Sequence, residues 1–236
     1  MKKIYLSPSD QVRNIYAYGD TNEAAQCRKI ASACKAALER NGFDVKTNFA
    51  DGTNAMYERV NESNAWGADL HICIHTNAGG GRGCVVFVSK NADKQLSYAQ
   101  PVFDEINAIT PYRSAYGIRE KQFYEIRNTN CVCVYCECEF HDSPLLAQWI
   151  VEHTDDIGEA LCRGVCRAAG RKYIEKGSED MERWNKLEDI PSGYREMAQR
   201  YVDAGALRGK GDGALDLTED MLRTMEIMRR YFEGEE

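Results

Sequence analysis

The chain has 236 residues, a formal net charge of -7 and ten cysteines. This length holds one domain of about 170 residues with a small appendage. Neither half carries a stripe of Lys and Arg, which a protein needs to neutralise nucleic-acid phosphates. No apolar run is long enough for a transmembrane helix. Nucleic-acid binding and membrane insertion are therefore not expected, and ten cysteines without a secretory leader favour a reducing compartment.

Strand and helix patterns alternate through the first 170 or so residues. Short β-forming runs indicate strands, and apolar residues at spacings of three and four indicate helices. This alternation is typical of an α/β fold with a mixed, largely parallel sheet flanked by helices on both faces. The predicted strands are residues 3–6, 43–49, 70–75, 83–88 and 131–138, and the predicted helices are residues 22–40, 56–66, 93–109 and two between 144 and 173. Residues 110–130 form a polar passage rich in Arg and Tyr that could close over a site.

The first predicted helix opens with a carboxylate. Thr21 or Asn22 can cap this helix, and Glu23 falls in its first turn. The helix dipole favours a carboxylate there, which is a purely structural explanation. The same side chain lies beside the exit loop of the first strand, where it could be a metal ligand. The distance along the sequence does not choose between these explanations.

Two histidines lie on the central strand of the pattern, in the run Ala-Asp-Leu-His-Ile-Cys-Ile-His-Thr-Asn-Ala at residues 68–78. His75 stands at the exit of this strand, and the carboxyl ends of parallel strands are where ligands bind in α/β sheets. Its imidazole is a candidate metal ligand or acid/base group. His71 is four residues earlier on the same face, about 13 Å away at ~3.3 Å per residue. The two cannot share one ion, so we interpret His71 as a buried core histidine.

The last predicted strand carries four cysteines and two glutamates. Alternation sends Cys131 and Cys133 to one face and Cys136 and Cys138 to the other, so four thiolates cannot converge on one metal ion. We expect buried apolar cysteines instead. Glu137 and Glu139 share a face near the end of the strand. A carboxylate is uncommon in a buried strand, and we expect a functional role for at least one of the two.

Together, these features resemble the zinc-dependent N-acetylmuramoyl-L-alanine amidases of the Amidase_3 type. The likeness rests on the first strand with its Pro, the helix opening with Glu23, the segment ending in His75, Arg59 before it, and Glu137-x-x-Phe140. It covers roughly residues 3–172. It implies hydrolysis of the bond between N-acetylmuramic acid and L-alanine in peptidoglycan. It also implies Zn²⁺ bound by Glu23 and His75, with Glu137 as the general acid/base.

The resemblance assigns further residues to the surroundings of this site. Arg59, Asn77 and Glu139 are expected to bind substrate or to tune the acid/base group. Glu139 occupies a position where the family usually has a small residue. Because two nearby carboxylates raise each other's proton affinity, Glu139 is expected to tune Glu137.

The first strand departs from the family pattern. Such amidases usually end this strand with Asp-Pro-Gly-His, and its histidine is the first zinc ligand; here the sequence is Ser7-Pro8-Ser9-Asp10. Direct alignment puts Asp10 at the ligand position, and Asp is an acceptable zinc ligand. In a site of Asp10, Glu23 and His75, the two carboxylates would formally neutralise the charge of the ion. A water molecule bound to that ion would then be less acidic than in a histidine-rich zinc site.

The pattern changes near residue 176, which predicts an amidase domain at residues 1–174 and a two-helix module at residues 177–236. The helices are expected at residues 193–204 and 219–232, the second capped by Thr218. A partial calcium-loop pattern precedes it, but Arg208 and Lys210 stand where ligands should be. Residues 205–218 loosely resemble one surface-layer-homology repeat, a wall-associated module. Because two helices bury little alone, this module should pack on the main domain or form a homodimer.

The leading hypothesis is a phage-type lysin, made in the cytoplasm without a signal peptide and acting on the cell wall after release. A first alternative is a catalytically silent wall-binding protein that kept the groove and lost the metal. A second is a zinc peptidase of related fold that cuts the stem peptide. Measuring the zinc content distinguishes the first alternative from the leading hypothesis. Identifying the released fragments distinguishes the second.

Overall fold

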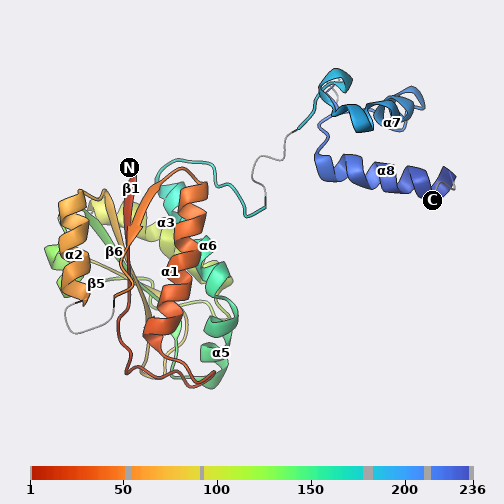
Figure 1. The fold of residues 1–236 in the computed structure, drawn as a ribbon. Coiled ribbons are helices and arrows are strands. Elements are labelled where there is room, and N and C mark those ends of the chain that lie inside the picture. Colours follow the sequence, from red (N-terminus) through yellow and green to blue (C-terminus); the bar gives the residue numbers. More distant parts are fainter. Residues whose placement is uncertain (1, 51–54, 91–92, 178–182, 210–213, 234–236) are drawn as a thin grey trace. The chain divides into compact units, whose positions relative to one another are not determined.

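The computed structural model describes residues 2–50, 55–90, 93–177, 183–209 and 214–233. The chain divides into two compact units, Met1–Glu175 and Lys176–Glu236 (Figure 1). No helix in the described ranges has both the length and the apolar character needed to cross a membrane.

The first unit is built on one six-stranded sheet with the order β2-β1-β3-β6-β4-β5. Strands β2, β1, β3 and β6 run parallel to one another, while β4 runs antiparallel to β6 and parallel to β5. The mixed, largely parallel sheet predicted from the sequence is therefore confirmed. The strands are β1 Lys3–Pro8, β2 Asp44–Thr47, β3 Leu70–Asn77, β4 Val85–Val88, β5 Ile118–Glu120 and β6 Val132–Phe140.

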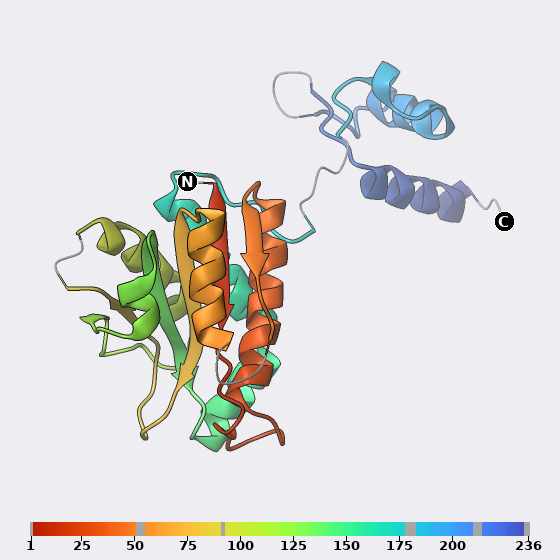
Figure 2. The ribbon, with the colours of Figure 1, turned by 60° about the vertical axis from the view of Figure 1, so that its left-hand side comes forward.

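Helices cover both faces of this sheet. On one face, α6 contacts both α1 and α3, and on the opposite face α2 contacts α4. In Figure 2, α2 lies in front of the strands. The helices are α1 Glu23–Arg40, α2 Ala55–Trp66, α3 Asp93–Ile109, α4 Tyr124–Asn128, α5 Pro144–Glu152 and α6 Thr154–Ala168. The predicted helices of this unit are all present, and the Asn22 side chain caps α1 by accepting a hydrogen bond from the Ala25 N–H.

The alternation of side chains along β6 divides the core in two. Cys136 and Cys138 belong to the large cluster under α1, α3 and α6, whereas Cys133 and Tyr135 belong to the smaller cluster on the other face. This confirms that the cysteines of this strand go to opposite faces. Cys133, Cys136 and Cys138 are buried thiols of the core, as expected, whereas Cys131 precedes β6 and is only partly buried.

Two stretches differ from the prediction. The polar passage at residues 110–130 contains two elements, β5 and α4. Strand β5 pairs with β4, and Ile126 of α4 packs into the smaller cluster. Strand β3 continues to Asn77, so His75 lies within the strand and not at its exit. The ladder with β6 extends this far because it tolerates a register shift between His75 and Asn77.

The second unit contains α7 Ser192–Asp203 and α8 Glu219–Glu233, preceded by a short 3-10 turn, η1 Leu187–Asp189. The predicted cap is confirmed, because the Thr218 hydroxyl accepts a hydrogen bond from the Met221 N–H. Lys210, like Asp212 and Gly213 of the calcium-like pattern, lies outside the described residues. A small core holds the helices together and includes Trp184, Ile190, Met197, Leu217 and Leu222.

Candidate active site

His75 and Glu23 meet at the side of the sheet where the parallel strands have their carboxyl ends. The Nδ1 atom of His75 lies 2.9 Å from Oε1 of Glu23, although 52 residues separate them. The helix start of α1 delivers the carboxylate, and β3 delivers the imidazole. Both are almost fully buried, at 7% and 1% exposure. The two side chains that the family resemblance assigns to zinc are thus in direct contact.

Buried hydrogen bonds hold Glu23 in its ionised form. The amide of Asn14 donates to Oε2 over 2.6 Å, and the Thr76 N–H donates to Oε1 over 3.4 Å. Burial alone would raise the pKa of Glu23, but its bond with His75 keeps that pKa below the ordinary value. Burial likewise opposes ionisation of His75, while Glu23 raises its pKa. The pair therefore combines a carboxylate with a basic imidazole.

Glu137 stands beside this pair on the neighbouring strand, in register with His75. Burial raises the pKa of its carboxyl group to about 7. The positive charge of His75 opposes this rise, and the negative charge of Glu23 adds to it. Its Oε2 atom is buried and has no hydrogen-bond partner among the described residues. An unpartnered carboxylate with a pKa near neutrality is suited to taking up and releasing a proton.

Asp10 lies just after β1 and forms an ion pair with Arg59. Its Oδ2 atom is 3.3 Å from Nη2 of Arg59, and the Arg59 side chain is only 2% exposed. Arg59 also donates from Nε to the Ser7 hydroxyl over 3.0 Å. The sequence did not indicate this pairing. Metal binding by Asp10 would use its other oxygen or require the ion pair to open.

Glu139 and Asn77 both make local contacts with the backbone. The Glu139 carboxylate accepts hydrogen bonds from the N–H groups of Gly83 and Phe140, over 2.6 and 3.0 Å. Burial raises the pKa of Glu139, and those two bonds oppose the rise. The Asn77 side chain accepts from the Ala78 N–H over 2.8 Å. These contacts give both residues a role in shaping the loop after β3 and the end of β6.

Glu125 was missed by the sequence analysis, yet it lies between the two histidines. Its Oε1 is 3.3 Å from Nε2 of His71, and its Oε2 is 3.9 Å from Nε2 of His75. The Ser7 hydroxyl donates to it as well. Glu125 comes from the short helix α4 inside the passage read as a polar loop, where no periodicity marked it as buried.

His71 has the predicted role of a core histidine. It is fully buried, its Nδ1 lies 3.0 Å from the Ser63 hydroxyl, and its ring stacks on Tyr5 with centroids 5.4 Å apart. With Glu125 at Nε2, both ring nitrogens have partners.

A cavity of about 940 Å³ opens beside these groups. Its polar lining includes Asp10, Arg59, His75 and Glu125, and its apolar wall includes Tyr57, Phe123, Tyr124 and Tyr135. The Tyr135 ring stacks on His75 with centroids 4.4 Å apart. The cavity therefore gives a substrate access to His75 along an aromatic wall.

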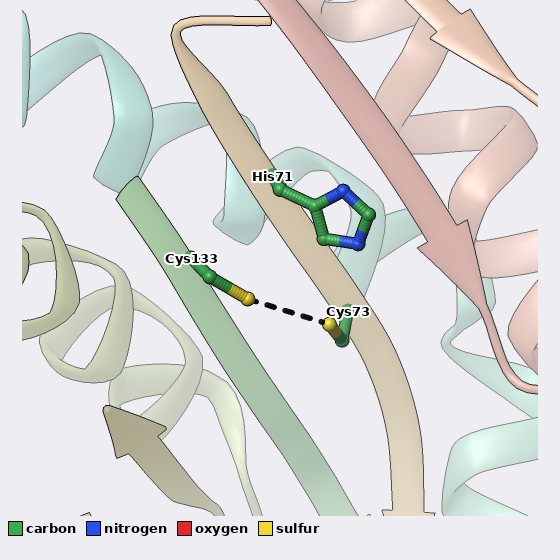
Figure 3. Close-up of side chains that lie close together, drawn as sticks. All are labelled: His71, Cys73 and Cys133. Carbon is green, nitrogen blue, oxygen red and sulfur yellow. Dashed lines mark hydrogen bonds between the residues drawn. The ribbon is translucent and has the colours of Figure 1, made fainter. Parts of the chain in front are cut away.

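A different trio satisfies a simple distance criterion for a metal site. Among the described residues, the group whose ligand atoms all lie within 4.8 Å of one another is His71, Cys73 and Cys133 (Figure 3). Asp10, Glu23 and His75 do not come this close together.

The chemistry of this trio argues against a metal. His71 already uses both nitrogens. Burial, with the neighbouring Cys133, raises the pKa of the Cys73 thiol well above its ordinary value. Zinc binds the thiolate and not the thiol, and all three side chains are fully buried. We interpret the trio as part of the core.

Comparisons with known proteins agree with the arrangement of the first unit. Solved structures of an N-acetylmuramoyl-L-alanine amidase from Clostridium difficile 630 and of AmiC2 from Nostoc punctiforme superpose with TM-scores of 0.66 and 0.64, at 22% and 19% identity. Each match covers 72% of this chain and 98% of the other. The catalytic domain of the CD27L endolysin, which targets Clostridia difficile, gives 0.59 at 21% identity, over 71% and 98% of the two chains. These likenesses establish the fold.

Sequence comparison assigns the family. The amidase CwlM of Bacillus licheniformis is 30% identical over 95 residues, a segment that spans 40% of this chain and 37% of that protein. The model of the zinc-dependent family described as N-acetylmuramoyl-L-alanine amidase, Amidase_3, matches residues 12–167. The match contains Glu23, His75 and Glu137 and covers well over half of the chain. This chain therefore belongs to the Amidase_3 family of N-acetylmuramoyl-L-alanine amidases.

Proposed function

We propose that the first unit hydrolyses the amide bond between N-acetylmuramic acid and the L-alanine of the peptidoglycan stem peptide. The observation that carries this proposal is the contact of His75 with Glu23 beside the unpartnered carboxylate of Glu137. Family membership supplies the substrate class. The wall of the bacterial cell is then the place of action.

The residues at this edge fit a zinc ion. An imidazole nitrogen and a carboxylate oxygen are ordinary zinc ligands, and here they converge in a buried position next to an orphaned carboxylate. Glu23 and His75 would hold the ion, and Asp10 would complete the protein ligands once it is released from Arg59. When bound, zinc polarises the amide carbonyl and makes a water molecule acidic.

The chain's own residues account for the proton transfers. Glu137 takes a proton from the attacking water molecule while the oxygen of that water molecule bonds to the carbonyl carbon. It then gives that proton to the leaving nitrogen when the carbon–nitrogen bond breaks. A pKa of about 7 suits both steps, because neither protonation state is strongly disfavoured at neutral pH. The aromatic wall of the cavity excludes water and orients the substrate.

The direct test is product analysis. Purified protein with zinc is incubated with purified peptidoglycan, and the released fragments are identified by mass spectrometry. We expect intact stem peptides with a free L-alanine amino group, and we expect a chelator to abolish their release. Cleavage within the stem peptide would instead support a zinc peptidase. Wall binding without any cleavage would support a silent binding protein.

We also propose that the second unit localises or dimerises the enzyme and performs no chemistry. Helix α8 exposes apolar side chains, with Ile227 at 62%, Tyr231 at 82% and Phe232 at 76% exposure. Such a surface is suited to a partner or to a wall polymer. Residues 177–236 carry 15 acidic and 9 basic side chains, so attraction to anionic wall polymers does not supply the binding energy.

A further inference from the structure

Glu125 occupies a position that the family's zinc and acid/base residues do not account for. Its carboxylate is 2% exposed and lies between two buried histidines of the same strand. One oxygen, Oε1, is 3.3 Å from Nε2 of His71, and the other, Oε2, is 3.9 Å from Nε2 of His75. The second distance is beyond a hydrogen bond, so that contact is electrostatic in the structure.

The surrounding donors are arranged so that Glu125 only accepts. Arg59 donates from Nε to the Ser7 oxygen over 3.0 Å, which directs the Ser7 hydroxyl proton to Glu125. His71 has a hydroxyl, that of Ser63, at Nδ1 and the carboxylate at Nε2. A carboxylate needs a proton from its partner, so Nε2 of His71 carries the hydrogen. Glu125 is therefore an anion with fixed neighbours.

His75 faces carboxylates with both of its nitrogens. Glu23 lies 2.9 Å from Nδ1, and Glu125 lies 3.9 Å from Nε2. These nitrogens point to different sides of the ring, so an ion held jointly by Glu23 and His75 would bind Nδ1. The other nitrogen, Nε2, then keeps its hydrogen and faces Glu125. Histidines that bind metals usually donate their second N–H to a carboxylate, a carbonyl or water.

We infer that Glu125 is a positioning residue for the metal centre, holding His75 in the form that carries its hydrogen on Nε2 and presents Nδ1 to zinc. The inference rests on the proposed zinc site of Glu23 and His75. Glu125 is not a ligand of the ion in this role. It acts through His75, while its bonds to Ser7 and His71 keep the carboxylate in place.

The matched pair of variants is Glu125→Gln and Glu62→Gln. Glutamine at 125 keeps the shape and can still accept from Ser7, but its amide group would donate to Nε2 and favour a hydrogen on Nδ1. Glu62 is the control because it also bonds to the sheet, accepting from the Tyr5 hydroxyl, without contacting His71 or His75. Zinc affinity is measured by competition with a chromophoric chelator, and folding by circular dichroism.

We expect Glu125→Gln to weaken zinc binding about 10- to 100-fold, which is the usual effect of removing such an outer partner. Glu62→Gln should bind zinc like the wild type, and Glu125→Asp, which keeps the charge, should fall between Gln and Glu. Unchanged affinity in a folded Glu125→Gln protein would overturn the inference and leave the proposed function intact. A wild-type protein that binds no zinc would contradict both.

A second measurement needs no variant. In the zinc-loaded, ¹⁵N-labelled wild-type protein, long-range ¹H–¹⁵N correlations of the imidazoles report which nitrogen carries hydrogen. We expect hydrogen on Nε2 of His75 and zinc on Nδ1. Zinc on Nε2 would place the ion on the Glu125 side of the ring and overturn the positioning role. Because an imidazole bound to zinc through Nδ1 must carry its hydrogen on Nε2, the expected result confirms the geometry on which the inference rests, and the opposite result overturns the inference even if Glu125→Gln does not fold.

Discussion

The guanidinium of Arg59 lies 3.3 Å from the carboxylate of Asp10, the residue that the sequence resemblance aligns with the family's first histidine ligand. An aspartate held by a buried arginine is a weaker metal ligand than a free one, because the ion must compete with the fixed positive charge. The metal centre of this chain is therefore expected to depend on whether this ion pair opens.

This relationship leads to a prediction for Asp10. If Asp10 is the third ligand, Asp10→Ala should weaken zinc binding more than the approximately 10- to 100-fold expected for an outer partner. Chelator competition on the folded variant measures the change. Asp44→Ala is a suitable control, because Asp44 is another strand-end carboxylate but pairs with Lys2. Wild-type affinity in Asp10→Ala would show that Asp10 is not a zinc ligand.

The location of zinc can be decided between two clusters. His75→Ala should lose zinc, because it removes a direct ligand. The double variant Cys73→Ala/Cys133→Ala should keep full zinc occupancy and lose only about 1 kcal/mol of stability per site, a common cost for a small core change. Atomic emission spectroscopy gives the stoichiometry. Full occupancy in His75→Ala would instead move the metal to the core trio.

Glu137 and Glu139 should behave differently when each is changed to glutamine. Glu137→Gln should abolish measurable amide cleavage while retaining zinc, since loss of a general acid/base costs about 10²- to 10⁴-fold. Glu139→Gln should mainly shift the pH profile, because it removes a negative charge close to Glu137 in the sequence, while glutamine can still accept from Gly83 and Phe140 and so keep the local structure. Cleavage of a soluble muropeptide measures both. Reversed roles would mean that the register of the end of β6 was assigned wrongly.

The pH dependence of the wild type follows from the same group. Burial raises the pKa of Glu137 to about 7 in the protein without an ion, and a bound cation would lower it. The general base must be ionised, so kcat/KM should rise with pH on the acid side and level off below or near pH 7. In Glu139→Gln this limb should move, whereas in Glu62→Gln it should stay in place.

The second unit can be removed to test its role. A chain truncated after Lys176 should keep its activity on soluble muropeptide, because the active-site residues all lie within the first unit. Its retention on intact walls should fall. Retention of the full chain should depend only weakly on salt, since the unit has no basic excess. Loss of soluble activity in a folded truncated protein would contradict this division of labour.

A stability prediction concerns the packing of α3 on α6. Glu105 lies 3.0 Å from Arg163 and 2.7 Å from Arg167, and these bonds outweigh burial to keep its pKa below the ordinary value. Because the pKa of Glu105 is lower in the folded state than in the unfolded state, where it is about 4.3, its ionised form stabilises the fold at any pH above that value. This stabilisation is lost as the pH falls through the pKa of the folded state. Glu105→Gln should therefore cost up to about 1 kcal/mol at pH 7.

Urea denaturation across the acid range measures this difference. The gap between wild type and Glu105→Gln should close as the pH falls below 4. Glu39→Gln, which removes a surface pairing with Lys35, should cost less because that pair is more exposed. An equal gap at every pH would mean that Glu105 acts through packing alone.

Local patterns in the sequence determined most of the first unit. The spacing of apolar residues defines α1, and the alternation along β6 places Cys133 opposite Cys136, because side-chain direction follows from backbone geometry. His71 was identified as a core residue by its place on a buried strand. Glu23, His75 and Glu137 were found because the family's short motifs are continuous in sequence.

Only the tertiary structure decided which charges meet. Glu125 contacts Ser7 and His71, which are 118 and 54 residues away, and Asp10 in the loop after β1 is paired with Arg59 of α2. No local pattern encodes such contacts, since they depend on strand order and on how α2 and α4 pack over the sheet. The same packing sets the burial that raises the pKa of Glu137. Sequence thus determined the candidate residues, and the fold determined their electrostatic environment.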